Sequence, residues 1–333
     1  MIDNNDDFLN MSKKEALEYC KNFDYNAKDF KYVTLDDIQV SSYRKEVKEF
    51  LNNLEIEFEE NVEILDNVTV DFFFKKEKVA LICNDTYEST LPRIKEKHNF
   101  KTKRAAELFF QKLSIDSEDN DIRLIHIFEF EWNNPDQKRV FKNIIKSACN
   151  IVKHRIYARK CEIHAVEMKT CDRKLFKELK KFFNENNIQG YKGSRYCTYL
   201  TYNDEIVHAF TWGSAFWSKG KIQYELIRGA SKHDYTIIGG SSRLWKHFKK
   251  TYDPESVVYY IDYNYFNGKS MEHMTDFEFE RISAPGIRNY WVLENVVKNR
   301  EPMRHKLIME LTKRGRILPI YNAGTKVFIY KKK

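Results

Sequence analysis

The stretch from Ile122 to Trp132, IRLIHIFEFEW, constrains the fold more than any other part of this sequence. Its first seven residues are apolar apart from one arginine and one histidine. A short apolar run of this kind is typical of a strand that is buried on both faces. The following NNPDQKRV opens a basic helix that runs from Pro135 to about Val152, since proline suits the first helical position. We therefore expect a core strand inside a sheet flanked by helices.

Periodic segments before this strand predict the rest of the sheet. SSYRKEVKEFLNNL, which begins at Ser41, places four apolar residues on one face of a helix, and IEFEENVEI alternates as a strand does. VTVDFFF and KVALIC are apolar runs joined by the charged turn Lys75–Lys78, which predicts a hairpin. With the helix KTKRAAELFFQKL, residues 41–153 have the order α-β-β-β-α-β-α. This order predicts an α/β domain with a mixed sheet.

A second α/β unit is expected over residues 154–333. Strands are predicted at IYARKCEIHAV, around residues 196–202, 205–212 and 222–228, and at SVVYYIDYNYF. Between them lie a basic helix, DRKLFKELKKFFNENN, and the segment IIGGSSRLWKHFKKTY, where a glycine turn opens a helix. Residues 1–40 form an acidic N-terminal extension whose main periodic signal is the capping pattern SKKE at Ser12. The chain therefore divides into an extension and two α/β domains.

The charge of the chain is sorted along its length. Residues 1–40 carry nine acidic and five basic side chains, whereas residues 134–181 carry fourteen basic and five acidic ones. Residues 301–333 carry nine basic and two acidic side chains. Basic segments release counterions when they neutralise phosphates, so this distribution favours DNA as a partner. Solvated Lys-rich helix faces are the alternative.

Other bulk features exclude several protein classes. No apolar run approaches about 18 residues, and no charged-then-apolar leader follows Met1, so we expect a soluble, cytoplasmic protein without a membrane segment. The six cysteines include no CxxC pair. This spacing fits neither a disulfide framework nor a zinc site, and we expect free, mostly buried thiols.

Asp71 is the acidic residue that most suggests chemistry. It interrupts the apolar strand VTVDFFF, where a carboxylate is costly to bury unless it binds a cation or finds donors. Metal-dependent DNA cleavage of the restriction-enzyme type needs carboxylates from a helix and two adjacent strands, because magnesium prefers hard oxygen ligands. Asp71 is therefore a candidate Mg²⁺ ligand. An aspartate that caps the strand end or faces solvent is the alternative.

Residues 41 to about 152 resemble the catalytic domain of phage Hef-like homing endonucleases, the EDxHD group related to very-short-patch repair endonucleases. The segments that carry the resemblance are SSYRKEVKEFL, TVDFFFK, ALICNDTYES, HNFKT and RLIHIFEFEW. The resemblance implies a restriction-endonuclease-like domain with Asp71 at the family's strand aspartate. The resemblance does not extend to the catalytic positions, because this chain has Arg44, Ile82 and Ser89 where the family has two glutamates and a histidine.

Two interpretations of this half remain open. A rebuilt catalytic site would combine Asp71, Asp85, Glu88 and His98 with a magnesium ion, and Glu46 would replace the missing helix acid. Degeneration is the favoured interpretation, since a fold that lost its carboxylates but kept its basic helices still binds DNA phosphates. The predicted DNA-binding residues are Lys101, Lys142, Lys146, Arg155, Arg159, Lys160 and Arg243.

Residues from about Tyr157 to the end resemble the C-terminal region that accompanies those nucleases. The matching pieces are IYARKCEI, NENNIQG, ELIRGASK, TIIGGSSRLWKHF, YIDYNYFNGKSME, NYWV and IYNAG. Part of this region also looks like the N-acetyltransferase-type fold of phage Mom-like base-modifying proteins. The likeness consists of a strand with Arg228, a glycine turn at a helix N-terminus, a strand with Asp262 and a short helix. It implies an acetyltransferase-like domain.

The glycine turn is the candidate cofactor site. Gly239 and Gly240 allow close approach of the backbone, and the N–H groups at the start of the following helix suit a pyrophosphate such as that of coenzyme A. We take Gly239, Gly240, Ser241 and Ser242 as candidate cofactor-binding residues. A plain tight turn with Ser241 as the helix cap is the alternative.

These observations predict a phage-type DNA-binding protein of the homing-endonuclease lineage, with metal-dependent phosphodiester hydrolysis only if the site has been rebuilt. An alternative is an acyltransferase that modifies DNA bases, with a coenzyme A-type donor at Gly239–Ser242 and Asp262 near the acceptor. A third possibility is a non-catalytic phage interaction protein that uses both folds. Retained coenzyme A favours the acyltransferase, and salt-dependent DNA binding without turnover favours the first function.

Overall fold

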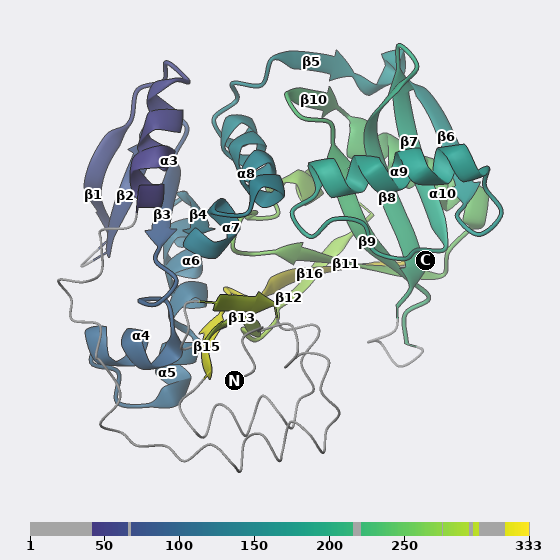
Figure 1. Cartoon of the computed structure of the whole chain (residues 1–333). Coiled ribbons are helices and arrows are strands. Elements are labelled where there is room, and N and C mark those ends of the chain that lie inside the picture. The colour runs from purple at the N-terminus through teal and green to yellow at the C-terminus, as the bar shows by residue number, and fades with distance from the viewer. Residues whose placement is uncertain are drawn as a thin grey trace, which may run out of the picture.

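The computed structural model describes residues 42–65, 68–215, 221–274, 276–292, 296–299 and 317–332. The chain has a mixed α/β fold, with a four-stranded and a seven-stranded sheet as its two main sheets (Figure 1). The α/β class predicted from the sequence is therefore confirmed. The acidic extension, with its capping pattern at Ser12, lies outside the described residues. None of the described helices is long and apolar enough to cross a membrane.

The N-terminal half, which we define as residues 41–153, contains the four-stranded sheet in the order β1-β2-β3-β4. The first three strands form an antiparallel meander, and the fourth lies parallel to the third. Its strands are β1 (Glu59–Leu65), β2 (Val68–Phe74), β3 (Val79–Asn84) and β4 (Arg123–Phe128). Every residue of β4 after Arg123 is buried, as the apolar run in RLIHIF requires.

Helices cover both faces of this sheet. α3 (Ser42–Asn52) and α8 (Pro135–Ala148) pack on one face through Val47, Leu51 and Phe141, among others. α6 (Phe109–Asp119) packs on the other face through Leu113. The remaining helices of this half are short, namely α4 (Leu91–Lys97), α5 (Lys103–Glu107) and α7 (Glu129–Trp132).

The C-terminal half, which we define as residues 154–333, is built on the seven-stranded sheet β12-β16-β11-β9-β8-β7-β6. β9 and β11 are its one parallel pair of neighbouring strands among the described residues, and the other pairs are antiparallel. Its strands are β6 (Glu162–Glu167), β7 (Tyr196–Tyr202), β8 (Glu205–Ser214), β9 (Tyr224–Ser231), β11 (Ser256–Asp262), β12 (Glu278–Ile282) and β16 (Thr325–Lys331).

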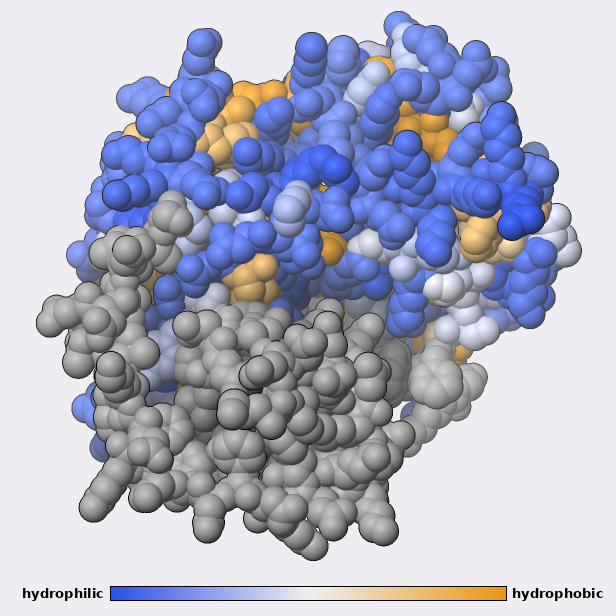
Figure 2. Space-filling view, in the orientation of Figure 1, coloured by the Kyte–Doolittle hydropathy of each residue, from blue (hydrophilic) through white to orange (hydrophobic). Residues whose placement is uncertain are grey.

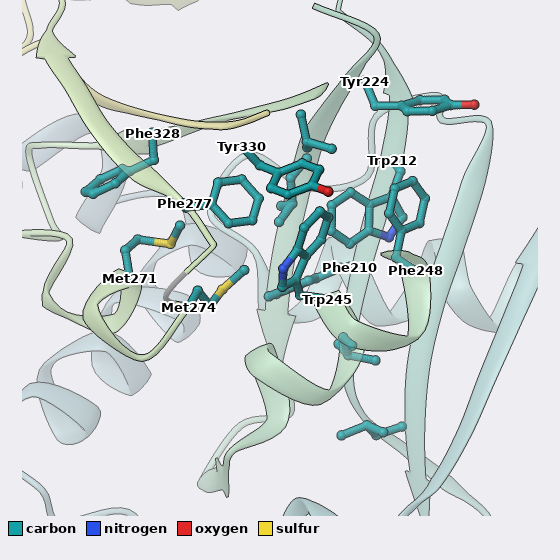
Figure 3. Close-up of a cluster of buried hydrophobic side chains, with 14 of the residues drawn as sticks. Phe210, Trp212, Tyr224, Trp245, Phe248, Met271, Met274, Phe277, Phe328 and Tyr330 are labelled. Carbon is teal, nitrogen blue, oxygen red and sulfur yellow. The ribbon is translucent and has the colours of Figure 1, made fainter. Parts of the chain in front are cut away.

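Two amphipathic helices cover opposite faces of the seven-stranded sheet. α9 (Arg173–Asn186) packs Leu179 and Phe183 against one set of alternating strand residues. α10 (Gly240–Tyr252) packs Trp245 and Phe248 against the other set, which forms the aromatic core of Figure 3. There the rings of Trp212 and Phe248 stack with their centroids 3.9 Å apart. The period-two alternation of the strands therefore fixes which helix lies on which face.

Smaller elements complete the C-terminal half. β5 (His154–Tyr157) and β10 (Tyr235–Ile238) form a parallel two-stranded ribbon, which lies at the top of Figure 1. A three-stranded sheet has the order β14-β13-β15. Its strands are β13 (Ile287–Val292), β14 (Val296–Asn299) and β15 (Ile317–Tyr321). The described part of this half also contains the 3₁₀ helices η2 (Ala158–Lys160) and η4 (Lys269–His273).

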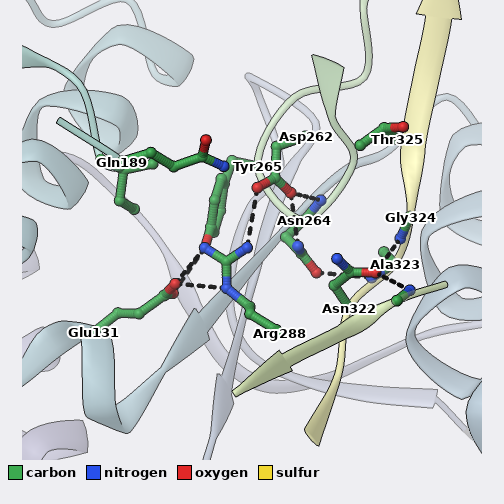
Figure 4. Close-up of polar contacts among 12 residues, drawn as sticks. Glu131, Gln189, Asp262, Asn264, Tyr265, Arg288, Asn322, Ala323, Gly324 and Thr325 are labelled. Atoms are coloured by element: carbon green, nitrogen blue, oxygen red, sulfur yellow. Dashed lines mark hydrogen bonds and ion pairs between the residues drawn. The ribbon is translucent and has the colours of Figure 1, made fainter. Parts of the chain in front are cut away.

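A buried polar network joins the two halves (Figure 4). Glu131 of α7 is 1% exposed, and its carboxylate accepts hydrogen bonds from Arg288 Nε at 2.7 Å and from the Tyr265 hydroxyl at 2.7 Å. Arg288 also pairs with Asp262 at the end of β11, with 3.1 Å between Nη1 and Oδ2. Burial alone would lower the pKa of Arg288, but the carboxylates of Glu131 and Asp262 outweigh it and raise that pKa well above its usual value.

Further side chains reinforce this junction. The Gln111 side-chain amide donates to the carbonyl oxygens of Ser283 and Ala323, at 2.7 and 3.0 Å. Glu118 accepts a hydrogen bond from the Tyr263 hydroxyl at 2.5 Å. Because buried polar groups need their partners, these contacts fix the halves relative to each other.

Replacing Arg288 with methionine should destabilise the whole chain. The change leaves the carboxylates of Glu131 and Asp262 without their counter-charge, and breaking a buried pair costs about 3–5 kcal/mol. Arg281, whose side chain is 57% exposed, is the matched control, and Arg281→Met should change the free energy of unfolding by no more than about 0.5 kcal/mol. Urea unfolding monitored by tryptophan fluorescence measures both. Equal effects of the two substitutions would contradict a central role for the network.

Candidate functional site

A cavity of about 670 Å³ opens where β9 and β11 separate. The two parallel strands pair only through residues 224–226 and 257–259. Their carboxyl-terminal parts, residues 227–231 and 260–262, do not pair with each other and line the cavity instead. In open α/β sheets, ligands bind in the crevice outside the carboxyl ends of parallel strands. The cavity occupies that position.

The N-terminal half supplies the opposite wall of the cavity. This wall consists of residues of α8, including Asn143 and Ile144, the turn between β2 and β3, and Arg123 at the start of β4. Pockets between packed domains are common binding sites for small molecules. Neither half forms this cavity by itself, so its shape depends on the polar network that joins them.

The start of α10 borders the cavity. Gly239 precedes the helix with a φ of 75°, a left-handed conformation that glycine adopts without strain. A Cβ atom at this position would have no heavy atom within 4 Å, so the turn is open to a ligand. The first N–H groups of a helix have no acceptors inside the helix, and Gly239 has no side chain to cap them. The turn therefore fits an anionic group such as a pyrophosphate.

Ser241, in the first turn of α10, lies beside a buried histidine. His208 Nε2 is 3.2 Å from the Ser241 hydroxyl, and its Nδ1 is 2.9 Å from the Ser231 hydroxyl at the end of β9. All three residues line the cavity. Burial lowers the pKa of His208 to about 4, so the ring is neutral at physiological pH. Sequence reasoning missed His208 because it lies in β8, far from the glycine turn in the sequence.

Arg243 forms hydrogen bonds within the C-terminal half. Its guanidinium donates to the carbonyl oxygen of Ala158 and, at 2.9 Å, to that of Cys161. These bonds hold η2 against α10. Its predicted contact with DNA would require both bonds to break.

Asp262 ends β11 and lines the cavity, as the acyltransferase interpretation expects for a residue near the acceptor. One carboxylate oxygen accepts hydrogen bonds from the backbone and side chain of Asn264, at 3.1 and 2.7 Å. The other pairs with Arg288. The network that joins the halves therefore also fixes the orientation of this carboxylate.

Asp71 has a cation as its partner. Its Oδ2 accepts a hydrogen bond from the backbone N–H of Cys83 at 2.5 Å, and its Oδ1 lies 2.8 Å from Arg44 Nη2. Burial raises the pKa of Asp71, and the bond from Cys83 and the charge of Arg44 only partly oppose it. Arg44 thus occupies the side of Asp71 where the resemblance implies a second acid. The sequence showed the substitution at Arg44 but not this ion pair.

The other predicted catalytic residues are engaged in local structure. Asp85 accepts hydrogen bonds from the backbone N–H groups of Tyr87 and Glu88, at 2.9 and 3.0 Å. Glu88 pairs with Arg93 at 3.0 Å, and the ring of His98 packs 4.3 Å from that of Phe109. Within the described ranges, no group of three or more His, Cys, Asp or Glu side chains is arranged to hold a metal ion. A magnesium site at Asp71 therefore stays a prediction, and Arg44 opposes it.

Apart from Arg243, the predicted DNA-binding residues divide into two groups. Lys142 lies over the rings of Phe50 and Trp132, and Lys146 pairs with Asp234 at 2.7 Å. The residues of the other group are exposed. Three of them lie on or beside β5 and η2, and the fourth precedes α5. Much of the surface in Figure 2 is also hydrophilic. This exposed group consists of Lys101, Arg155, Arg159 and Lys160.

Comparison with known proteins yields only partial likenesses. No family model and no curated protein matches this chain. The ribosomal-protein-S18-alanine N-acetyltransferase from Escherichia coli is 9% identical, with coverage of 51% of this chain and 94% of that one and a TM-score of 0.30. A Bacillus subtilis acetyltransferase in complex with CoA is 12% identical, with coverage of 52% and 100% and a TM-score of 0.31.

A third solved structure gives a similar result. An acetyltransferase from Bacillus anthracis strain Ames, in complex with acetyl coenzyme A, is 10% identical, with coverage of 45% of this chain and 68% of that one and a TM-score of 0.25. TM-scores this low do not establish a shared fold. Any function for this chain must therefore be inferred from its own site.

The variant Asp71→Asn should be more stable than the wild type at neutral pH. The pKa of Asp71 in the folded chain is raised above its ordinary value of 3.8, so the folded state holds the proton more tightly than the unfolded state does. Ionised Asp71 therefore lowers the free energy of unfolding as the pH rises through this window. In urea titrations, the difference in the free energy of unfolding between variant and wild type should grow as the pH rises above the ordinary pKa of 3.8. A variant that is less stable at neutral pH would show that the Arg44 ion pair outweighs burial.

Proposed function

We propose that this protein is an acyltransferase that uses a coenzyme A-type thioester donor. The single observation that carries the proposal is the cavity at the separating carboxyl ends of β9 and β11, bordered by the uncapped start of α10. This arrangement offers a helix terminus for a pyrophosphate and an enclosed space for the acyl end of the donor.

The donor would supply an activated acyl group as a thioester. The turn Gly239–Ser242 would hold its pyrophosphate through backbone N–H groups, aided by the positive end of the α10 dipole. Gly240 cannot carry a larger side chain here, because a Cβ atom would lie 2.9 Å from the ring of His208. The two glycines therefore keep the turn close to the sheet and open to the ligand.

Residues deeper in the cavity would orient the transfer. Tyr259 of β11 lines the cavity, and burial raises the pKa of its hydroxyl to about 12, so it stays a hydrogen-bond donor at neutral pH. Such a donor suits the departing thiolate, which gains negative charge as the acyl group leaves. The fixed carboxylate of Asp262 would accept a hydrogen bond from the incoming nucleophile.

Gly239 offers a matched pair of substitutions that test donor binding. The site is exposed and open, and both asparagine and aspartate tolerate the left-handed conformation. Gly239→Asn should bind coenzyme A about as well as the wild type, whereas Gly239→Asp should raise the Kd by about tenfold, or about 1.4 kcal/mol, because its charge repels the pyrophosphate.

Isothermal titration with coenzyme A, together with circular dichroism to confirm folding, measures this difference. Equal Kd values for the Asn and Asp variants would place the ligand elsewhere. An absence of binding to the wild-type chain would refute the donor itself.

DNA binding without cleavage is a second candidate function. The observation that favours it is the exposed basic group of Arg155, Arg159 and Lys160, next to Tyr157, which is 49% exposed. Arg159 lies over the Tyr157 ring, 5.0 Å from its centroid. Basic side chains beside an exposed aromatic ring suit phosphates and unpaired bases. The pairing of Asp71 with Arg44 supports loss of the nuclease activity.

The triple variant Arg155→Ala, Arg159→Ala and Lys160→Ala should weaken DNA binding and reduce its salt dependence. Each lost phosphate contact lowers the slope of log K against log salt by about 0.9. The control carries alanine at Lys95, Lys112 and Lys250, which are also exposed. Fluorescence anisotropy across a salt series measures the slopes. A plasmid incubated with Mg²⁺ or Mn²⁺ should remain uncut, and cutting that Asp71→Ala abolishes would establish an active nuclease instead.

A further inference from the structure

Arg123 has a partly buried guanidinium that pairs with no carboxylate of the described residues. Its Nε and Nη2 atoms donate to the carbonyl oxygen of Tyr265, at 3.3 and 2.9 Å, and its guanidinium lies 5.6 Å from the centroid of the Phe266 ring. Among the residues that the structure describes, no carboxylate forms an ion pair with it. Burial lowers the pKa of Arg123 to about 10, and the nearby Cys149 opposes this shift only in part.

Arg288, in the same junction between the halves, has its positive charge balanced by carboxylates. It is also buried, but Glu131 and Asp262 pair with it and raise its pKa. A buried charge without a partner costs several kcal/mol. Among the described residues, Arg288 therefore has carboxylate partners and Arg123 has neutral ones, and Arg123 is the one that lines the cavity.

The charges around Arg123 do not neutralise the cavity. Its lining includes five basic and three acidic side chains. Two of those acids already have cations, since Asp121 pairs with Lys78 and Lys269, and Asp262 pairs with Arg288. The basic lining residues are Lys76, Lys78, Arg123, Arg228 and Lys269, and the acidic ones are Glu77, Asp121 and Asp262. The cavity therefore favours an anionic guest.

We propose that Arg123 binds the anionic group, a carboxylate or a phosphate, of a small acyl acceptor that enters the cavity. This inference rests on the proposed acyl transfer and adds the chemical class of its acceptor. Arginine suits both anions, because its planar fork forms paired hydrogen bonds with either of them. Arg123 lies on the wall formed by the N-terminal half, so the acceptor would bridge the two halves, whereas the start of α10 would hold the donor.

Thermal unfolding with added anions tests this proposal. The wild-type chain is melted in increasing inorganic phosphate, in increasing succinate, and in sodium chloride of matched ionic strength. A ligand that binds only the folded state raises the melting temperature in a saturable way, which yields an apparent Kd. Phosphate or succinate should stabilise the chain beyond chloride, and the anion that does so identifies the acceptor group.

Three variants locate the anion. Arg123→Met keeps an apolar stem against Phe266 and should raise the apparent Kd at least about tenfold. Arg123→Lys keeps the positive charge but not the planar guanidinium, and its apparent Kd should lie between those of Arg123→Met and the wild type. This variant tests the proposal if Arg123→Met does not fold. Arg281→Met, which removes an exposed arginine, should bind as the wild type does. Gly239→Asp alters the proposed donor site at the helix start, so it identifies anion binding there, and the loss of anion binding in Arg123→Met should exceed the loss in Gly239→Asp.

Several outcomes would overturn the proposal. They are the absence of anion-specific stabilisation in the wild type, an apparent Kd unaffected at Arg123, and a loss confined to Gly239→Asp. Titration of the wild type and of Arg123→Met with coenzyme A tests the donor proposal separately from the acceptor proposal. If coenzyme A binds but the small anions do not, the acceptor proposal alone fails. If the anions bind through Arg123 but coenzyme A does not bind, the anion site is supported and the proposed acyl transfer is refuted.

Discussion

The ion pair between Glu131 and Arg288 is the interaction on which the rest of the structure depends. It joins residues from the two halves where the side chain of Glu131 is 2% exposed and that of Arg288 is 12% exposed, so separating the halves would leave both charges without a partner. Asp262 completes the same network and also lines the cavity. The pair therefore fixes the relative position of the two halves and, with it, the shape of the proposed active site.

This junction gives the N-terminal half a different role from the one its sequence suggests. Its acidic residue Asp71 is held by Arg44 and by the backbone of Cys83, which give each carboxylate oxygen a donor. At the same time Arg123, at the start of β4, faces the C-terminal half and pairs with no carboxylate in the described part of the chain. On the proposed function, the N-terminal half forms one wall of an acyltransferase cavity.

The sequence predicted those features that depend on neighbouring residues. Strand β4 followed from its apolar run, the β2–β3 hairpin from the charged turn, and the start of α10 from its glycines, because each signal is local. The site depends on distant pairs that no periodicity reveals. Glu131 and Arg288 are 157 positions apart in the sequence. The sequence pattern identified Arg123 only as part of a predicted strand. Likewise, the cavity exists only once β9 and β11 separate and the other half covers them.

A crystal structure of the protein with coenzyme A tests the central claim most directly. The account predicts that the pyrophosphate lies at Gly239–Ser242 and that the rest of the donor enters the cavity between β9, β11 and the N-terminal half. Coenzyme A bound at another surface, or no bound ligand at saturating concentration, would contradict it.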